Sequence, residues 1–233
     1  MTRTRSILLT AAGFLILMPA AFGIGTAPAA QLHPDTHDWP ALFSADLSDA
    51  EFPVGVWTVE DGILTASEDQ AIWTKRDYGN FILDLEFKTA PGTNSGVIVY
   101  CSDRADWIPN SVEIQIADDY AEQWATSPAT WHCGAIFGHL APTRSLVNKP
   151  GEWNHYTVTC QGKKIYVMLN GEQVTALDMS LWTSAKFNPD GSEIPAWLSK
   201  PLAELATKGR IGLQGKHAGA PIFFRNIRIK EII

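Results

Sequence analysis

The chain has 233 residues, of which 45% are hydrophobic and 18% charged, and it contains nine Trp, fourteen Pro and only three Cys. This composition excludes a disordered chain, a collagen-like repeat and a disulfide-dense miniprotein, so a conventional hydrophobic core must hold the fold. A formal net charge of -7 argues against nucleic acid or an acidic membrane as a partner, because proteins that bind them gather Lys and Arg on one face.

The first 29 residues have the features of a secretory signal peptide. Arg3 and Arg5 precede an uncharged apolar run over residues 7–18, which is shorter than the roughly 20 apolar residues of a membrane span. An A-x-A cleavage motif follows at residues 27–29. We therefore expect residues 1–29 to be removed. Residues 30–233 are expected to form a single domain that is secreted or periplasmic and not embedded in a membrane.

Alternation of apolar and polar residues predicts a succession of β-strands. Over residues 81–88, Phe and Leu alternate with Asp, Glu and Lys, as in a half-buried strand. The period-two pattern recurs at residues 112–116, 156–160 and 223–229, and residues 96–101 predict a more fully buried strand. Asn170 and Gly171 between two such runs indicate a tight hairpin turn.

Helical character is confined to residues 195–206, where Trp197, Leu198, Leu202 and Leu205 predict one apolar side of a short surface helix or turn. Many short strands separated by Gly and Pro turns, with so little helix, are typical of an all-β protein. We expect a two-sheet antiparallel β-sandwich or jelly roll.

One predicted strand carries the clearest candidates for chemistry. Alternation places Glu113, Gln115 and Ala117 on the face opposite the core. A glycosidase that cuts an ordinary glycosidic bond needs two carboxyl groups, and Ala117 stands where a second would be expected. The two-carboxylate mechanism is therefore possible here only if a bulge at the end of the strand brings Asp118 or Asp119 into the site. The alternative is a solvated strand face.

Further candidates lie close to this strand. Asn94, at the polar entrance to a buried strand, either binds a sugar hydroxyl or caps the turn. Aromatic rings stack on sugars, but most Trp residues of a sandwich belong to its core. Among Tyr100, Trp107, Trp124 and Trp131, only Trp107 lies in a loop suited to a cleft rim.

His217 lies beside Lys216 in a polar loop between two strands, where it either moves a proton or forms a solvated hairpin tip. The histidines have no metal-ligand spacing, so we predict no metal and no cofactor, with assistance by a divalent cation left open. Cys101, Cys133 and Cys160 fit either one disulfide or buried free thiols.

Several motifs occur in order along nearly the whole predicted domain: L-F-S-A-D-L at 42–47, W-T-V-E-D-G-I-L at 57–64, W-T-K-R-D-Y-G-N-F at 73–81, N-S-G-V at 94–97, E-I-Q-I at 113–116, G-A-I-F at 134–137, K-P-G-E-W-N at 149–154 and G-R-I-G-L-Q at 209–214. Each motif alone is weak. Their joint order resembles the 3-keto-disaccharide hydrolase domain family, which implies a concanavalin A-like jelly roll.

The resemblance implies cleavage of 3-keto-glycosides or 3-keto-disaccharides by elimination and hydration, which needs one base rather than a carboxylate pair. It implies the following roles: Glu113 or His217 as the base, Gln115, Asn94 and Lys216 as groups that stabilise an enolate or hold hydroxyls, and Trp107 and Tyr100 as the sugar platform. A sugar 3-dehydrogenase is implied as the functional partner that makes the substrate. Two rivals are a non-catalytic carbohydrate-binding module and a conventional endo-glycosidase that uses Asp118 or Asp119.

Overall fold

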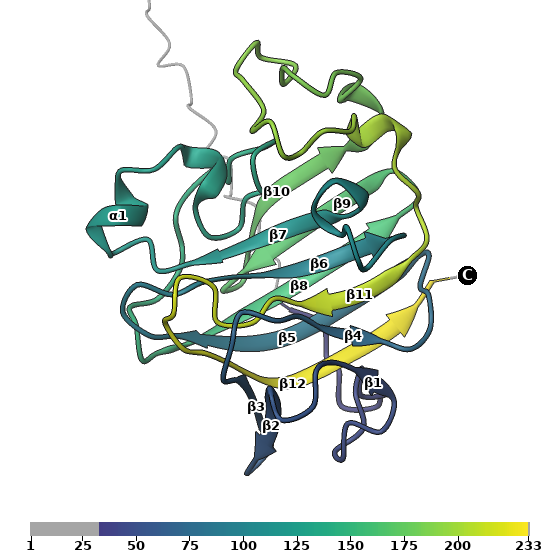
Figure 1. Ribbon diagram of the computed structural model, residues 1–233, viewed down its shortest axis with the longest axis vertical. Helices are drawn as coiled ribbons and strands as arrows, with labels where there is room; N and C mark the ends of the chain where they lie inside the picture. The colour runs from purple at the N-terminus through teal and green to yellow at the C-terminus, as the bar shows by residue number, and fades with distance from the viewer. Residues whose placement is uncertain (1–32, 233) are drawn as a thin grey trace, which may run out of the picture.

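The computed structural model describes residues 33–232, so the predicted signal peptide and its cleavage site lie outside the described residues. Two antiparallel β-sheets pack face to face (Figure 1). This confirms the predicted all-β sandwich. Within the described part of the chain, no helix is both long and apolar enough to cross a membrane.

The first sheet has five strands, in the spatial order β1 (Ala50–Glu51), β4 (Ile72–Thr74), β11 (Arg210–Leu213), β6 (Asn94–Cys101) and β7 (Val112–Ala117). The second sheet has seven strands, in the order β10 (Glu172–Asp178), β9 (Lys164–Leu169), β8 (Trp153–Gln161), β5 (Phe81–Thr89), β12 (Ile222–Glu231), β3 (Ile63–Ala66) and β2 (Trp57–Glu60). Strands far apart in the sequence are therefore neighbours, as β11 and β6 show.

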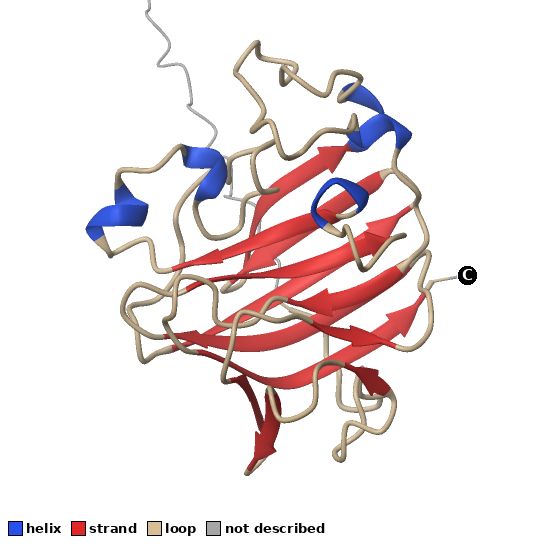
Figure 2. Cartoon of the chain, in the orientation of Figure 1, coloured by secondary structure: helices blue, strands red, loops and turns tan. Residues whose placement is uncertain are grey.

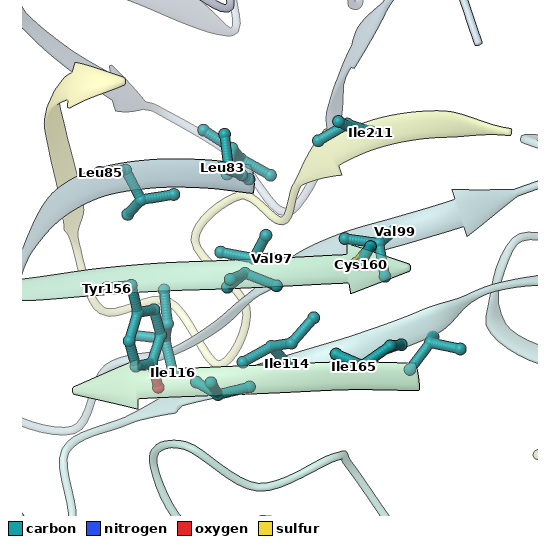
Figure 3. Close-up of a cluster of buried hydrophobic side chains, with 14 of the residues drawn as sticks. Leu83, Leu85, Val97, Val99, Ile114, Ile116, Tyr156, Cys160, Ile165 and Ile211 are labelled. Atoms are coloured by element: carbon teal, nitrogen blue, oxygen red, sulfur yellow. The ribbon is translucent and has the colours of Figure 1, made fainter. Parts of the chain in front are cut away.

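The alternation that predicted the strands also positions the core. Phe81, Leu83, Leu85 and Phe87 of β5 have no solvent exposure, because they point between the sheets while the polar residues of the same strand face outward. Side chains from both sheets meet in this layer (Figure 3). Burial of this apolar surface supplies the main favourable term in folding.

The predicted hairpin turn joins β9 to β10. Asn170 and Gly171 both have positive φ, at 49° and 89°, as the two-residue turn between right-twisted strands requires. Asn170 also donates from its side chain to the carbonyl of Leu146 at 2.8 Å. The turn thus sets the register of two strands and holds a neighbouring loop.

In residues 33–232, helical structure consists of one short α-helix and four 3-10 turns that lie in loops around the sheets (Figure 2): α1 (Glu122–Ala125), Ile108–Asn110, Ala129–Trp131, Met179–Leu181 and Leu202–Glu204. Residues 195–206, predicted as a short surface helix or turn, contain only the last of these 3-10 turns. Pro201 immediately precedes that turn and prevents a longer helix. Leu198, Leu202 and Leu205 are buried, whereas Trp197 is exposed.

The three cysteines are all free and buried. Cys133 and Cys160 belong to the core between the sheets, while Cys101 packs in a small outer cluster with Trp73 and Ile98. Of the two interpretations that the sequence left open, the structure therefore supports buried free thiols.

Candidate functional site

A pocket of about 380 Å³ lies on the outer face of the five-stranded sheet. It is lined by a polar floor and an apolar wall: Asn94, Glu113, Gln115, Gln214 and His217 form the floor, and Ile108, Trp124, Trp131, Phe137 and Trp197 form the wall. The structure thus brings together four of the predicted site residues, Asn94, Glu113, Gln115 and His217. Gln214 and most of the wall were not predicted.

Strand pairing explains how distant residues reach one floor. Glu113 and Gln115 are outward residues of β7, and Asn94 begins the adjacent strand β6. His217 forms a β-bridge with Asn94, on the side away from β7. Side chains on one face of neighbouring strands lie side by side, so Glu113 and His217 flank the floor from opposite sides.

Glu113 is desolvated by its position in the pocket. Burial, and after it the negative charge of Asp69, raise the pKa of this carboxyl group from its ordinary 4.5 to about 8. A carboxyl group with such a pKa carries its proton at neutral pH. Glu113 is therefore suited to donate a proton or a hydrogen bond.

His217 forms a dyad with Asp69, a residue that the sequence did not single out. The Nδ1 atom of His217 lies 2.7 Å from a carboxylate oxygen of Asp69. A carboxylate at Nδ1 holds the proton there and leaves Nε2 as a proton acceptor. The two side chains are about half exposed, so this base is open to solvent as well as to the pocket.

The amides of the floor have hydrogen-bonding capacity to spare. Gln115 donates from Nε2 to Oδ1 of Asn94 at 3.0 Å, which holds both amides in place. The buried Oε1 atoms of Gln115 and Gln214 have no partner among residues 33–232. Buried polar atoms are normally paired in proteins, so these two oxygens are positioned for a polar ligand.

The wall is a continuous aromatic surface. Trp131 packs against Phe137 with ring centres 5.4 Å apart and against Trp197 with ring centres 6.2 Å apart. The wall residues come from separate loops, which explains why their convergence is not visible in the sequence. The one sign of the wall in the sequence is the presence of Trp in loop segments. Such residues belong either to the core or to a binding surface, and only the tertiary structure distinguishes the two.

The prediction that Tyr100 forms part of a sugar platform is wrong. Its side chain has no solvent exposure and donates a hydrogen bond to the carbonyl of Gly162 at 2.8 Å. The cause is a bulge in β6, where the pairing with β11 slips between Arg210 and Gly212 and Tyr100 has a φ of 59°. The bulge reverses the alternation and turns Tyr100 into the core.

Trp107 and Lys216 lie near the pocket without lining it. Trp107 packs edge-on against Trp73 at 6.2 Å and lines a neighbouring hollow with Arg104 and Gln70. The backbone N–H of Lys216 donates to the carbonyl of Glu68 at 3.0 Å, which fixes the loop that presents His217. The structure therefore separates these two residues from the floor.

Asp118 and Asp119 serve the loops around the site. Asp118 accepts hydrogen bonds from the backbone N–H groups of Gly92 and Tyr120. Asp119 accepts from the backbone N–H of Cys133 and from the hydroxyl of Ser145. Neither aspartate lines the pocket, so neither supplies the second carboxylate of a conventional glycosidase.

A cluster of possible metal ligands lies on the other sheet. The ligand atoms of His33, Asp84 and His155 are within 4.8 Å of one another. However, the imidazole rings of His33 and His155 are stacked 3.6 Å apart at 14°, so their in-plane nitrogen lone pairs lie in two nearly parallel planes and do not meet at one point between the rings. His33 is also hydrogen-bonded to Thr157 and Gly171. This cluster fits a hydrogen-bond network better than a metal centre.

Comparison with known proteins gives one family. Residues 35–230 match the model of the 3-keto-alpha-glucoside-1,2-lyase-like domain. No curated protein matches the chain.

Solved structures agree with this match. The chain is 57% identical to a Parabacteroides distasonis protein provisionally named a glycosyl hydrolase, with a TM-score of 0.82 over 83% of this chain and 99% of that one. A second such protein from the same organism is 22% identical, with a TM-score of 0.67 over 80% and 90% of the two chains. A Bacillus subtilis protein with a galectin-like fold is 12% identical, with a TM-score of 0.50 over 82% and 93%, and shows the jelly-roll fold alone.

Proposed function

The chain belongs to the family of 3-keto-alpha-glucoside-1,2-lyase-like domain proteins, and from this membership we propose that it cleaves 3-keto-glycosides or 3-keto-disaccharides by elimination followed by hydration. A carbohydrate-related role of glycosyl hydrolase type is common to the family and to the Parabacteroides distasonis protein that is 57% identical. The geometry of the pocket supports the finer proposal.

The reaction requires one base, one acid and donors for an oxyanion. The ketone at C3 acidifies the hydrogen on C2, so removal of that proton gives an enolate. The enolate re-forms the ketone as the C1–O bond breaks, which leaves a C1=C2 double bond and a protonated leaving group. Water then adds its hydroxyl to C1 and its hydrogen to C2. The sum is hydrolysis without a nucleophilic carboxylate.

His217 is the base in this proposal. Its Nδ1 is held by Asp69 at 2.7 Å, so Nε2 accepts the C2 proton and the imidazolium that forms is stabilised by the carboxylate. Glu113 is less suited to this step, because a carboxyl group with a pKa of about 8 is already protonated at neutral pH.

Glu113 is the acid. Its proton passes to the leaving oxygen as the C1–O bond breaks, and the carboxylate that results deprotonates water in the hydration step. Asn94, Gln115 and Gln214 line the same pocket, and in this proposal their side-chain amides stabilise the enolate oxygen or hold sugar hydroxyls. These residues suffice without a metal, so we expect a chelator to leave the rate unchanged.

The observation that carries the proposal is the placement of a His–Asp dyad and a protonated carboxyl group on opposite sides of one polar floor. A test separates the two steps by using deuterium exchange at C2 of a 3-keto-glucoside in D₂O. We expect His217→Asn to abolish both exchange and cleavage. We expect Glu113→Gln to retain exchange and to lose cleavage, because Gln donates a hydrogen bond but no proton.

Loss of exchange in Glu113→Gln together with full exchange in His217→Asn would reverse the two roles. A wild-type protein that binds the sugar but neither exchanges C2 nor releases product would instead be a carbohydrate-binding module. Turnover of unoxidised glycosides would support a conventional glycosidase. The wild-type rate should also fall above a pH of about 8, as Glu113 loses its proton.

Two further parts of the proposal concern the cellular setting. The substrate must carry a ketone at C3, so an enzyme that oxidises sugars at that position, a sugar 3-dehydrogenase, has to supply it. Arg3, Arg5 and the apolar run after them support export to the periplasm or beyond. Detection of the mature N-terminus in a periplasmic extract would test this localisation.

A further inference from the structure

We infer that the pocket selects substrates whose leaving group is apolar and of phenyl size, in preference to substrates whose leaving group is a second sugar. This inference rests on the proposed function and deepens it, because it assigns the aromatic wall to the departing part of the substrate. It combines three observations: the exposure of the wall, its small number of hydrogen-bonding groups and the position of Phe137 beside Glu113.

The wall exposes apolar surface that the core does not use. Trp197 is 52% exposed and Ile108 is 38% exposed, and both line the same pocket as the half-buried Trp124, Trp131 and Phe137. Isolated exposed apolar residues are ordinary, but a contiguous apolar patch beside polar groups marks a binding surface. The wall therefore offers a binding surface for an apolar group.

The wall offers little to hydroxyl groups. Phe137 and Ile108 have no polar side-chain atom, and the indole N–H of Trp124 already donates to the carbonyl of Gly92 at 3.0 Å. The wall therefore offers hydroxyl groups only the indole N–H groups of Trp131 and Trp197, and each sugar hydroxyl left unpaired against it costs about 1–3 kcal/mol. A phenyl or alkyl group has no such cost and gains aromatic contacts.

One residue of the wall, Phe137, lies next to the acid that protonates the leaving group. The backbone N–H of Phe137 donates to the carbonyl of Glu113 at 3.0 Å, and the next pair, Ile136 and Ile114, forms a β-bridge. Phe137 is therefore the lateral neighbour of Glu113, while His217 lies beyond Asn94 on the other side. An acid that protonates the leaving oxygen must adjoin the leaving group, so that group meets the wall.

The experiment compares two 3-keto substrates of the same anomer, one with 2-phenylethanol as leaving group and one with glucose linked through its primary hydroxyl. Both leaving groups are primary alcohols, so their difference in intrinsic reactivity is small. We expect the phenylethyl substrate to have the higher kcat/KM. Trp197→Ala should lower its kcat/KM about tenfold, which corresponds to one lost aromatic contact of about 1.4 kcal/mol, and should lower that of the disaccharide less than threefold.

Phe187→Ala is the matched control, because Phe187 is an exposed aromatic residue, at 51% exposure, that does not line the pocket. It should leave both substrates unchanged. Equal losses for the two substrates in Trp197→Ala, or a preference for the disaccharide, would overturn the inference while the proposed elimination still stands.

A binding measurement keeps the inference testable if no turnover occurs. Unoxidised 2-phenylethyl glucoside should bind more tightly to the wild type than the matching unoxidised disaccharide does, with quenching of Trp fluorescence, and Trp197→Ala should remove the difference. Tighter binding of the disaccharide would contradict the inference. Absence of cleavage for both 3-keto substrates would contradict the proposed function alone.

Discussion

The carboxyl group of Glu113 lies directly over the backbone of Gly96. A Cβ atom built at position 96 would lie 2.8 Å from Cγ of Glu113 and 2.9 Å from its Cδ. The two residues are diagonal neighbours, since Glu113 pairs with Ile98 and Gly96 pairs with Gln115. A glycine on β6 therefore makes the space in which the acid of the site lies against the sheet, partly shielded from water.

Substitution of Gly96 by Ala should harm the reaction more than the fold. The added Cβ displaces a side chain that has room to move outward, so we expect a small change in melting temperature. A misplaced acid should lower kcat about 10- to 100-fold, as displacements of about 1 Å do in active sites. Gly79→Ala is the control, because the nearest atom to its Cβ would be 3.8 Å away. Full activity of the Gly96 variant would show that the position of Glu113 is not critical.

Glu113→Gln should stabilise the protein at alkaline pH. With a pKa of about 8 in the folded state and 4.5 ordinarily, Glu113 binds more protons in the folded than in the unfolded protein between these values. Its contribution to stability therefore falls as the pH rises from 4.5 to 8. Melting temperatures of variant and wild type should agree at pH 4 and differ most above pH 8. Exposed Glu60, changed to Gln, should show no such trend.

The fold was predictable because alternation is a local property. β5, β7, β8 and β12 were each visible as apolar residues at every second position, and the turn at Asn170 and Gly171 was visible as a dipeptide. For residues 195–206 the sequence left a helix or a turn open, and the structure has a 3-10 turn with the leucines of the segment buried. The spacing of the apolar residues in this segment is compatible both with a helix and with a loop that contains Pro201, so it does not distinguish them.

The sequence predicted the site residues most clearly where they lie on a single strand. Glu113 and Gln115 follow from alternation on β7, but Asp69 is 148 residues from His217 along the chain, and only the tertiary fold joins them. Tyr100 was predicted in the site but lies in the core. It is an even number of residues from Asn94 and Gly96, so regular alternation predicts that it shares their face of the sheet. A single extra residue in the bulge turns the side chain to the opposite face of the sheet. No residue type in the segment indicates that a bulge occurs there.

Tyr100→Phe should therefore affect stability and leave activity unchanged. The substitution removes the hydrogen bond from the phenol to the carbonyl of Gly162 and keeps the ring that packs edge-on against Phe81. We expect a loss of about 1 kcal/mol in the free energy of unfolding, measured in urea. A large loss of kcat with unchanged stability would instead return Tyr100 to the site.

The thiols should be unreactive in the native protein. Burial raises the pKa of Cys101 to about 11 and that of Cys133 to about 12, and it raises the pKa of Cys160 further. Because the thiolate is the reactive form, a disulfide reagent such as DTNB should titrate no thiol before denaturation and three afterwards. A reducing agent should not change the melting temperature, and a decrease would indicate a disulfide.

His33 should lower the stability of the folded protein in acid, because its hydrogen bonds require a neutral imidazole ring. The backbone N–H of Gly171 donates to its Nε2 at 2.8 Å, so the proton is on Nδ1, which lies 2.7 Å from the hydroxyl of Thr157. That hydroxyl in turn donates to Asp84 at 2.6 Å. Protonation of Nε2 would place two N–H groups against each other. Burial, and then the nearby His155, lower the pKa of His33 from 6.5 to about 4, although Asp84 opposes the shift.

A folded-state pKa below the ordinary value means that His33 binds fewer protons in the folded protein, so stability should fall as the pH drops from 6.5 to 4. His33→Phe keeps a ring beside His155 but cannot titrate. It should be less stable than the wild type at pH 7, and the difference should shrink toward pH 4. Urea unfolding at both pH values measures this, with exposed His37→Phe as the control. A difference that stays constant with pH would mean that His33 contributes packing alone.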